Sequence, residues 1–220
     1  SKFKPAMALK GQVSTNKNAG TLLRKGLVTF QFVISIFLII STMVIHRQLD
    51  YISSRPLGYD TNNLISMPVR GDMASKFDIF KQELQQVPGV KAVSAGSHNM
   101  ISFGSNTSGF EWPGKTKDQD FLISYTEIGY DFVKTTGLEM AEGRDFSPEF
   151  GADSLACLLN ETAVRKMGLK EPVIGTVIQS DTNMVVVGVV KDFVFNNPEN
   201  FIEPMILFLT RKNFNSFFIQ

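Results

Sequence analysis

The chain has 220 residues, of which 43% are hydrophobic and 20% are charged, and its net charge is +1. Its single cysteine, Cys157, excludes an intramolecular disulfide, and its two histidines, His46 and His98, lie far apart in the sequence. The sequence contains no H-E-x-x-H zinc motif, no phosphate-binding glycine loop and no G-x-S-x-G motif. We therefore expect no catalytic residues, no metal site and no cofactor bound by this chain.

The chain is dominated by an uncharged apolar run at residues 27–45, LVTFQFVISIFLIISTMVI. As a helix this run spans roughly 28 Å, which is close to the thickness of a bilayer's hydrocarbon core. A buried core helix is one alternative, but such helices rarely run this long without a charge. A cleaved signal peptide is another, but its apolar region is usually shorter and no A-x-A-like cleavage site follows this run. The run predicts a retained transmembrane helix.

The charges on either side of this run predict its orientation. The residues before Leu27 include six basic and no acidic side chains, whereas the rest of the chain has 16 basic and 21 acidic ones. Basic residues near a span favour the cytoplasmic side, so residues 1–21 are expected to form a cytosolic linker and the main domain to lie outside. The acidic balance of the outer part excludes a basic nucleic-acid-binding face. Because the chain starts without Met inside such a linker, we expect it to be an excerpt of a longer protein.

The helix is expected to continue beyond the membrane as a stalk, over residues 22–55 in all. No breaker occurs before Pro56, and Leu49 and Ile52 stand one helical turn apart. A helix of this length would measure roughly 50 Å. We expect Gln48, Leu49 and Ile52 to belong to the stalk.

Within the apolar run, Gln31, Ser35 and Thr42 share one helix face. An amide in hydrocarbon is costly unless another helix satisfies it, so these residues are candidate contacts with further membrane helices. The alternative is that the two hydroxyls bond back to their own helix while Gln31 reaches toward the headgroups.

The outer part is predicted to be an α+β domain with a β-α-β unit at its start. Runs of apolar and β-branched residues indicate strands. The expected strands are 63–69, 90–95, 110–112, 121–128, 156–159, 173–178, 184–190 and 204–209. The expected helices are 74–87, 130–136 and 160–167, of which the last is capped by Asn160.

Four ordered segments of the outer part resemble the periplasmic domain of MacB-like ABC transporter permeases. They are VPGVKAVSAGS, YTEIGYDFVKTTGLEMAEGRDFS, LLNETAVRKMGLKEPVIGTVI and MVVVGVVKDFVF followed by IEPMILFL. The membrane stretch LRKGLVTFQFVISIFLIISTMVIHRQLDYI is similar to the first helix of an FtsX-like half in larger, two-half permeases. The segment FKPAMALKG resembles the end of a preceding half of this kind.

The resemblance implies two nested lobes. An outer, porter-like lobe would comprise residues 56–96 and 196–220, and a sabre-like insert would comprise residues 97–195. Family members continue with a further helix, a strand and three more membrane helices, so the porter-like lobe is expected to be incomplete here.

The resemblance also implies a non-catalytic permease subunit in the inner membrane. A separate cytosolic ATPase would bind ATP, and its closure would pass along the stalk to move substrate on the periplasmic side. The expected partners are that ATPase, other permease helices in a dimeric or pseudo-dimeric assembly, and a periplasmic or outer-membrane protein. The family handles antibiotics, antimicrobial peptides, toxins and lipoproteins, and no residue here selects among them. The alternative is a single-pass sensor or ligand-binding module.

Five other residues carry expectations of their own. Cys157 lies in an apolar run and is expected to be a buried small hydrophobe, while His46 is expected to face headgroups or a neighbouring helix. Asp192 and Phe193 follow a strand and predict a tight turn with the ring packed inward. Trp112, beside Pro113 and Gly114, is a candidate partner contact, and its alternative is a satellite core position.

Overall fold

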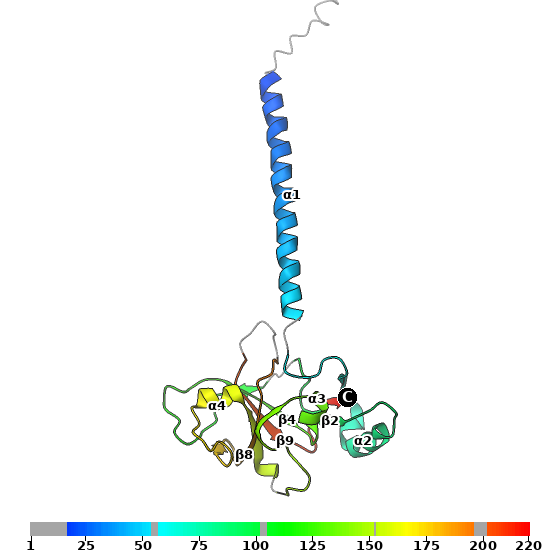
Figure 1. The fold of residues 1–220 in the computed structure, drawn as a ribbon, viewed down its shortest axis with the longest axis vertical. Helices are drawn as coiled ribbons and strands as arrows, with labels where there is room; N and C mark the ends of the chain where they lie inside the picture. The colour runs from blue at the N-terminus through cyan, green and yellow to red at the C-terminus, as the bar shows by residue number, and fades with distance from the viewer. Residues whose placement is uncertain (1–16, 54–56, 102–104, 152, 196–201) are drawn as a thin grey trace, which may run out of the picture. The chain divides into compact units, whose positions relative to one another are not determined.

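The computed structural model describes residues 17–53, 57–101, 105–151, 153–195 and 202–220. The chain divides into two compact units, Ser1–Ser54 and Arg55–Gln220. Figure 1 shows the elements of both units.

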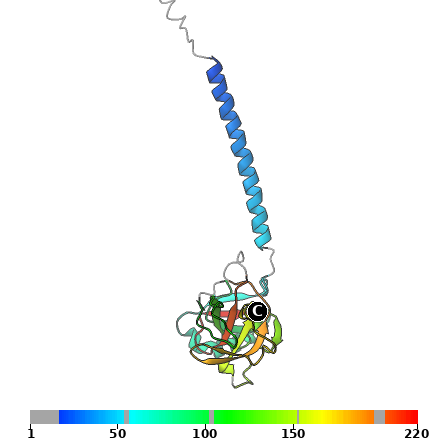
Figure 2. The same ribbon diagram turned by 90° about the vertical axis from the view of Figure 1, so that its left-hand side faces the viewer.

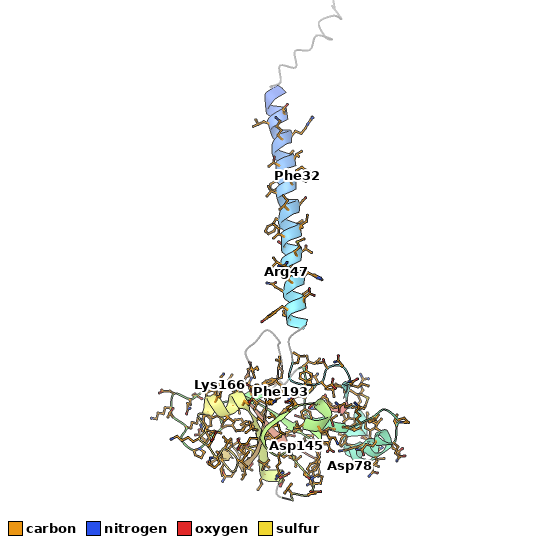
Figure 3. All side chains as sticks on the ribbon, in the orientation of Figure 1. Phe32, Arg47, Asp78, Asp145, Lys166 and Phe193 are labelled. Atoms are coloured by element: carbon orange, nitrogen blue, oxygen red, sulfur yellow. The ribbon has the colours of Figure 1, made fainter. Side chains whose placement is uncertain are left out.

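The first unit contains one helix, α1 (Lys17–Ser53). It has 37 residues and is uninterrupted in both views of the chain (Figures 1 and 2). Its apolar side chains point outward on all sides, and Figure 3 labels Phe32 on its apolar part and Arg47 beyond it. The stretch Gly20–Ile52 is long and apolar enough to cross a membrane. The expected continuous helix through His46, Arg47 and Gln48 is thus present.

The second unit is built on one mixed sheet with the strand order β1-β10-β2-β4-β9-β6-β8-β5. Two short strands lie off this path, where β3 pairs with β4 and β7 pairs with β8. Most pairs are antiparallel, but β4 with β9 and β6 with β8 are parallel. The strands are β1 (Ile65–Pro68), β2 (Val93–Gly96), β3 (Asn106–Thr107), β4 (Ile123–Ile128), β5 (Met140–Gly143), β6 (Ala156–Asn160), β7 (Val177–Gln179), β8 (Asn183–Val190), β9 (Met205–Leu209) and β10 (Ser216–Ile219).

Short helices flank this sheet, with α2 and α4 at opposite ends of the domain in Figure 1. They are α2 (Phe77–Gln85), α3 (Phe132–Thr136) and α4 (Glu161–Met167), with 3-10 turns η2 (Gly71–Lys76) and η3 (Asp153–Leu155). The Asn160 side chain accepts a hydrogen bond from the Ala163 backbone N–H at 2.9 Å and so caps α4, as predicted.

Three buried clusters form the core. The smallest lies between α2 and the strands β1, β10 and β2, where Phe77 packs against Phe217. The other two contain side chains from β4, β6, β8 and β9. Neighbouring residues of β10 point to opposite faces, so Phe217 joins the first cluster and Phe218 the cluster around Phe132. Strand β10 therefore connects two parts of the core.

Several sequence predictions need correction. Residues 110–112 form no strand, because Glu111 makes only an isolated bridge to Gln179. The helix expected at 74–87 begins as the 3-10 turn η2 and becomes α-helical at Phe77. Strands β5 and β10 were not predicted.

The strand pairing bears on the predicted boundary between the porter-like lobe and the insert. The last strand, β10, pairs with β1 and β2 of the predicted porter-like lobe. The strand β9 instead pairs with β4 and β6, whose residues belong to the predicted insert. The division at residues 97 and 195 stays a prediction.

Candidate functional site

The polar stripe of α1 forms hydrogen bonds within its own helix. The Ser35 hydroxyl donates to the Gln31 carbonyl oxygen at 2.9 Å, and the Thr42 hydroxyl donates to the Leu38 carbonyl oxygen at 2.8 Å. The two hydroxyls therefore do not need another helix, as the alternative interpretation holds. A contact between the Gln31 amide and a further helix stays a prediction.

The stalk part of α1 carries both charged and apolar exposed side chains. His46 and Asp50 stand one turn apart, with Nε2 and Oδ2 separated by 3.7 Å. Leu49 is 56% exposed, and Ile45 one turn earlier is equally so. His46 thus faces a carboxylate of its own helix, and Leu49 presents an apolar surface.

The chain enters the second unit through residues 57–60, which we call the anchoring segment. The Val194 N–H donates to the Leu57 carbonyl oxygen at 2.8 Å, just after strand β8. The Asp60 N–H donates to the Thr136 carbonyl oxygen of α3 at 2.9 Å. The Gln220 amide donates to Asp60 Oδ2 at 3.3 Å. The segment is therefore bonded to three places that are distant from one another in the sequence.

The anchoring segment also requires glycine at position 58. Gly58 has a φ of 82°, which side chains rarely adopt. A Cβ there would stand 2.8 Å from the Asp192 carbonyl oxygen and 2.9 Å from the Phe193 Cα. Only a residue without a side chain lets the segment lie this close to Phe193, which is itself buried.

Helix α3, to which the anchoring segment is bonded, is in turn tied to α2 and β2. Lys81 of α2 pairs with Asp131 at a distance of 2.5 Å between Nζ and Oδ2. The Ser94 hydroxyl of β2 donates to the Tyr130 carbonyl oxygen at 2.8 Å. Asp131 adopts a left-handed conformation with a φ of 64°. These contacts join α3 to two elements of the predicted porter-like lobe.

A pair of carboxylates lies beside the turn after β5. Arg144 pairs with Asp153, which is 1% exposed, through Nη2 and Oδ1 at 2.6 Å and Nη1 and Oδ2 at 2.9 Å. Burial alone would raise the pKa of Asp153, but its bonds to Arg144 and to the Ser147 N–H lower it. Burial raises the pKa of Asp145 to about 6, and the charges of Asp131 and Asp153 act in the same direction. The two carboxylates therefore respond to pH in opposite ways.

A polar cluster around His98 was not singled out in the sequence. His98 Nδ1 lies 3.0 Å from the hydroxyls of Ser97 and Thr126, and Nε2 lies 3.4 Å from the Ser105 hydroxyl. Burial lowers the pKa of His98, and the nearby Glu127 charge partly offsets this. The cluster joins residues after β2 to strand β4, and we assign it a structural role.

Four further residues have clear places in the structure. Trp112 is 6% exposed and its indole N–H donates to the Met167 carbonyl oxygen at 2.9 Å, so it is a core residue and not an exposed partner contact. Cys157 is buried, and burial raises the pKa of its thiol to about 12. Phe193 packs inward as expected, while Asp192 accepts hydrogen bonds from the Thr162 N–H and hydroxyl and pairs with Arg165.

Among the described residues, no three His, Cys, Asp or Glu side chains could together hold a metal ion. What the geometry offers is a long apolar helix and a domain whose first residues are anchored at several points.

Comparison with known proteins gives a family match and structural neighbours. The model of the MacB-like periplasmic core domain matches residues 27–216. The periplasmic region of MacB from Actinobacillus actinomycetemcomitans is 15% identical, with a TM-score of 0.50 over 77% of this chain and 79% of that one. A domain of a putative permease protein from Porphyromonas gingivalis is 17% identical, with a TM-score of 0.46 over 72% and 73%. The extracellular domain of the noncanonic ABC-type transporter YknZ from Gram-positive bacteria is 18% identical, with a TM-score of 0.45 over 72% and 81%. A search of curated proteins finds no match.

Proposed function

Because the chain belongs to the family of MacB-like periplasmic core domains, we propose that its helix transmits movement between an ATPase in the cytosol and the domain outside the inner membrane. The chain would then be the part of an ABC transporter permease that couples ATP hydrolysis to substrate movement. In this proposal ATP is bound by a separate subunit, as the family resemblance implies.

The observation that carries this proposal is the continuity of α1. A helix resists bending unless proline, a glycine-serine pair or a bulge interrupts it, and α1 has no proline over its 37 residues. Only residues 54–56 separate it from the anchoring segment. A displacement that reached Leu57 would act on Val194 after β8, on α3 and on Gln220 just after β10, because the anchoring segment is bonded to these three places.

The assembly follows from the same proposal. We place the N-terminal residues in the cytosol and the second unit in the periplasm, on the charge asymmetry described above. Gln31 would contact other permease helices in a dimeric or pseudo-dimeric transporter, and Gln48, Leu49 and Ile52 would form the transmitting stalk. The nested porter-like and sabre-like lobes are part of this proposal, which the pairing of β10 with β1 and β2 supports.

Leu49→Pro tests the transmission. A proline in the helix interior removes one backbone hydrogen bond and clashes with the preceding turn, at a cost of about 3 kcal/mol or more. In the complete transporter, we expect Leu49→Pro to retain most of the ATPase activity of the reconstituted complex and to lose export in cells.

Leu49→Met is the matched control, because it keeps both the helix and an apolar side chain. It should export at close to the normal level. Normal export by Leu49→Pro at normal expression would show that the helix is only an anchor.

A further inference from the structure

The outer flank of α2 carries an apolar groove that the sheet does not cover. The groove has a volume of about 490 Å³ and is lined by Asp72, Met73, Lys76, Ile79, Phe80 and Glu83. Ile79 is 64% exposed, whereas Phe77 and Leu84 pack on the sheet. Phe80 is half-buried, with its ring centroid 5.1 Å from that of Phe217 of β10, and it also lines the groove. Asp78, labelled in Figure 3, marks the position of this helix in the domain. A large apolar side chain in an apolar groove is typical of a docking surface.

The charges beside the groove have a regular arrangement. Lys76 stands three residues before Ile79, and Glu83 stands three residues after Phe80. Both charged side chains belong to exposed residues that line the groove. Within the part of the chain that the structure describes, no ion pair involves either of them, whereas Lys81 on the inner side pairs with Asp131.

This arrangement is self-complementary about a two-fold axis. In an antiparallel helix pair, a residue before the axis on one helix faces a residue at the same distance after the axis on the other. If the axis passes between positions 79 and 80, Ile79 of each copy faces Phe80 of the other. The same symmetry places Lys76 of each copy opposite Glu83 of the other. One contact would therefore cover two apolar pairs and form two ion pairs.

We propose that a second copy of this chain docks on the α2 groove through an antiparallel α2–α2 contact centred on Ile79 and Phe80. The charge pattern favours a second copy over an unrelated partner, because the groove supplies both members of each ion pair. The contact goes beyond the transport role proposed above, and its failure would leave that role untouched.

The contact is expected to be weak for free molecules and effective in a membrane. Two helices of nine residues bury less than the ~1,200 Å² that is usual for a stable complex. Copies held in one bilayer meet at a high effective concentration, so a weak surface is enough to pair them. The test is therefore made with the whole chain in membranes.

Cysteine cross-linking tests the geometry. Ile79→Cys in the membrane-bound chain should give a disulfide-linked dimer on mild oxidation, at least fivefold more than Leu122→Cys. Leu122 is a matched control, because it is 60% exposed and lies on another part of the domain. The parent chain should remain monomeric on the same gel, since its Cys157 is buried. Equal cross-linking of the two variants would overturn the proposal.

A charge exchange tests the symmetry. In the Ile79→Cys background, Lys76→Glu should lower the dimer yield severalfold, because it sets two carboxylates against each other. Adding Glu83→Lys should restore the yield, since the ion pairs are then rebuilt with their signs reversed. A double variant as poorly cross-linked as Lys76→Glu would overturn the two-fold contact and indicate docking of a different kind.

Discussion

Asp145, in the turn after β5, and Asp153, at the start of η3, respond to pH with opposite signs. The pKa of Asp145 is about 6 in the folded domain, above the usual value of 3.8, so the folded state binds this proton more tightly than the unfolded state. Its contribution to the free energy of unfolding is therefore lost as pH rises between about 4 and 6. The pKa of Asp153 is lowered in the folded domain. Asp153 therefore adds to the free energy of unfolding at pH values above the ordinary aspartate pKa, and this stabilisation is lost as pH falls through the lowered folded-state pKa.

We predict that Asp145→Asn stabilises the domain at pH 7.5 and not at pH 4. The amide keeps an oxygen to accept from the Phe146 N–H but carries no charge to bury. The gain at pH 7.5 should be about 1–2 kcal/mol, allowing for the partial exposure of the side chain. Urea unfolding at the two pH values measures it.

Asp153→Asn is the contrasting variant, because it breaks a buried ion pair with Arg144. It should destabilise the domain at pH 7.5 by about 3 kcal/mol. A stabilising Asp153→Asn, or an Asp145→Asn effect that is the same at both pH values, would contradict this assignment of the two carboxylates.

Gly58 allows a second test at the residue scale. Gly58→Ala should cost roughly 2–4 kcal/mol of unfolding free energy, because it combines an unfavourable φ with a collision against Asp192 and Phe193. Gly89→Ala is the matched control, with a φ of 99° and no heavy atom within 4 Å of the added Cβ. It should cost only about 1 kcal/mol. Equal losses in thermal unfolding would show that the close approach at Gly58 has no energetic weight.

At the scale of single elements, α1 offers the clearest functional prediction. Gln31→Leu should weaken co-purification of this helix with the rest of the transporter, because interhelical hydrogen bonds contribute about 0.6–2 kcal/mol in membranes. Phe37→Leu, on a different face, should assemble normally. If both variants assemble equally well, Gln31 makes no helix contact.

Elements with strong local patterns were predictable from the sequence. Helix α1 follows from its long uncharged run, β6, β8 and β9 from their apolar content, and α4 from its Asn160 cap and from Gly168 after its end. Strand β5 has the sequence MAEG, which lacks β-branched residues, and β10 follows the polar stretch NFN, so neither has a strong local signal.

The functional positions were harder to predict, because long-range packing decides them. Trp112 and the neighbouring Phe110 indicated a strand, but both are buried by tertiary contacts with the cluster around Ile123. The approach of Gly58 to Phe193 depends on residues far along the chain, so it has no local signal. The groove on α2 depends on which flank the sheet covers, and periodicity alone does not show this.

For the whole molecule, the proposed role depends on α1 crossing the membrane, with the cytosolic linker before it and the second unit on the outer side. The sheet joins the ten described strands of the second unit, and the anchoring segment connects the start of that unit to Val194 after β8, to α3 and to Gln220 after β10. A force applied at Leu57 would thus act on a domain that is connected throughout. Such a transmission of force has a function only if α1 crosses the bilayer.

The most direct test of this account is the labelling of single cysteines with a membrane-impermeant maleimide in intact cells with a permeabilised outer membrane. Ser180→Cys, at the exposed tip between β7 and β8, should be labelled, and Ser14→Cys should be labelled only after the cells are lysed. The parent chain is the control, because buried Cys157 should not react. Labelling of Ser14→Cys and protection of Ser180→Cys in intact cells would contradict the account.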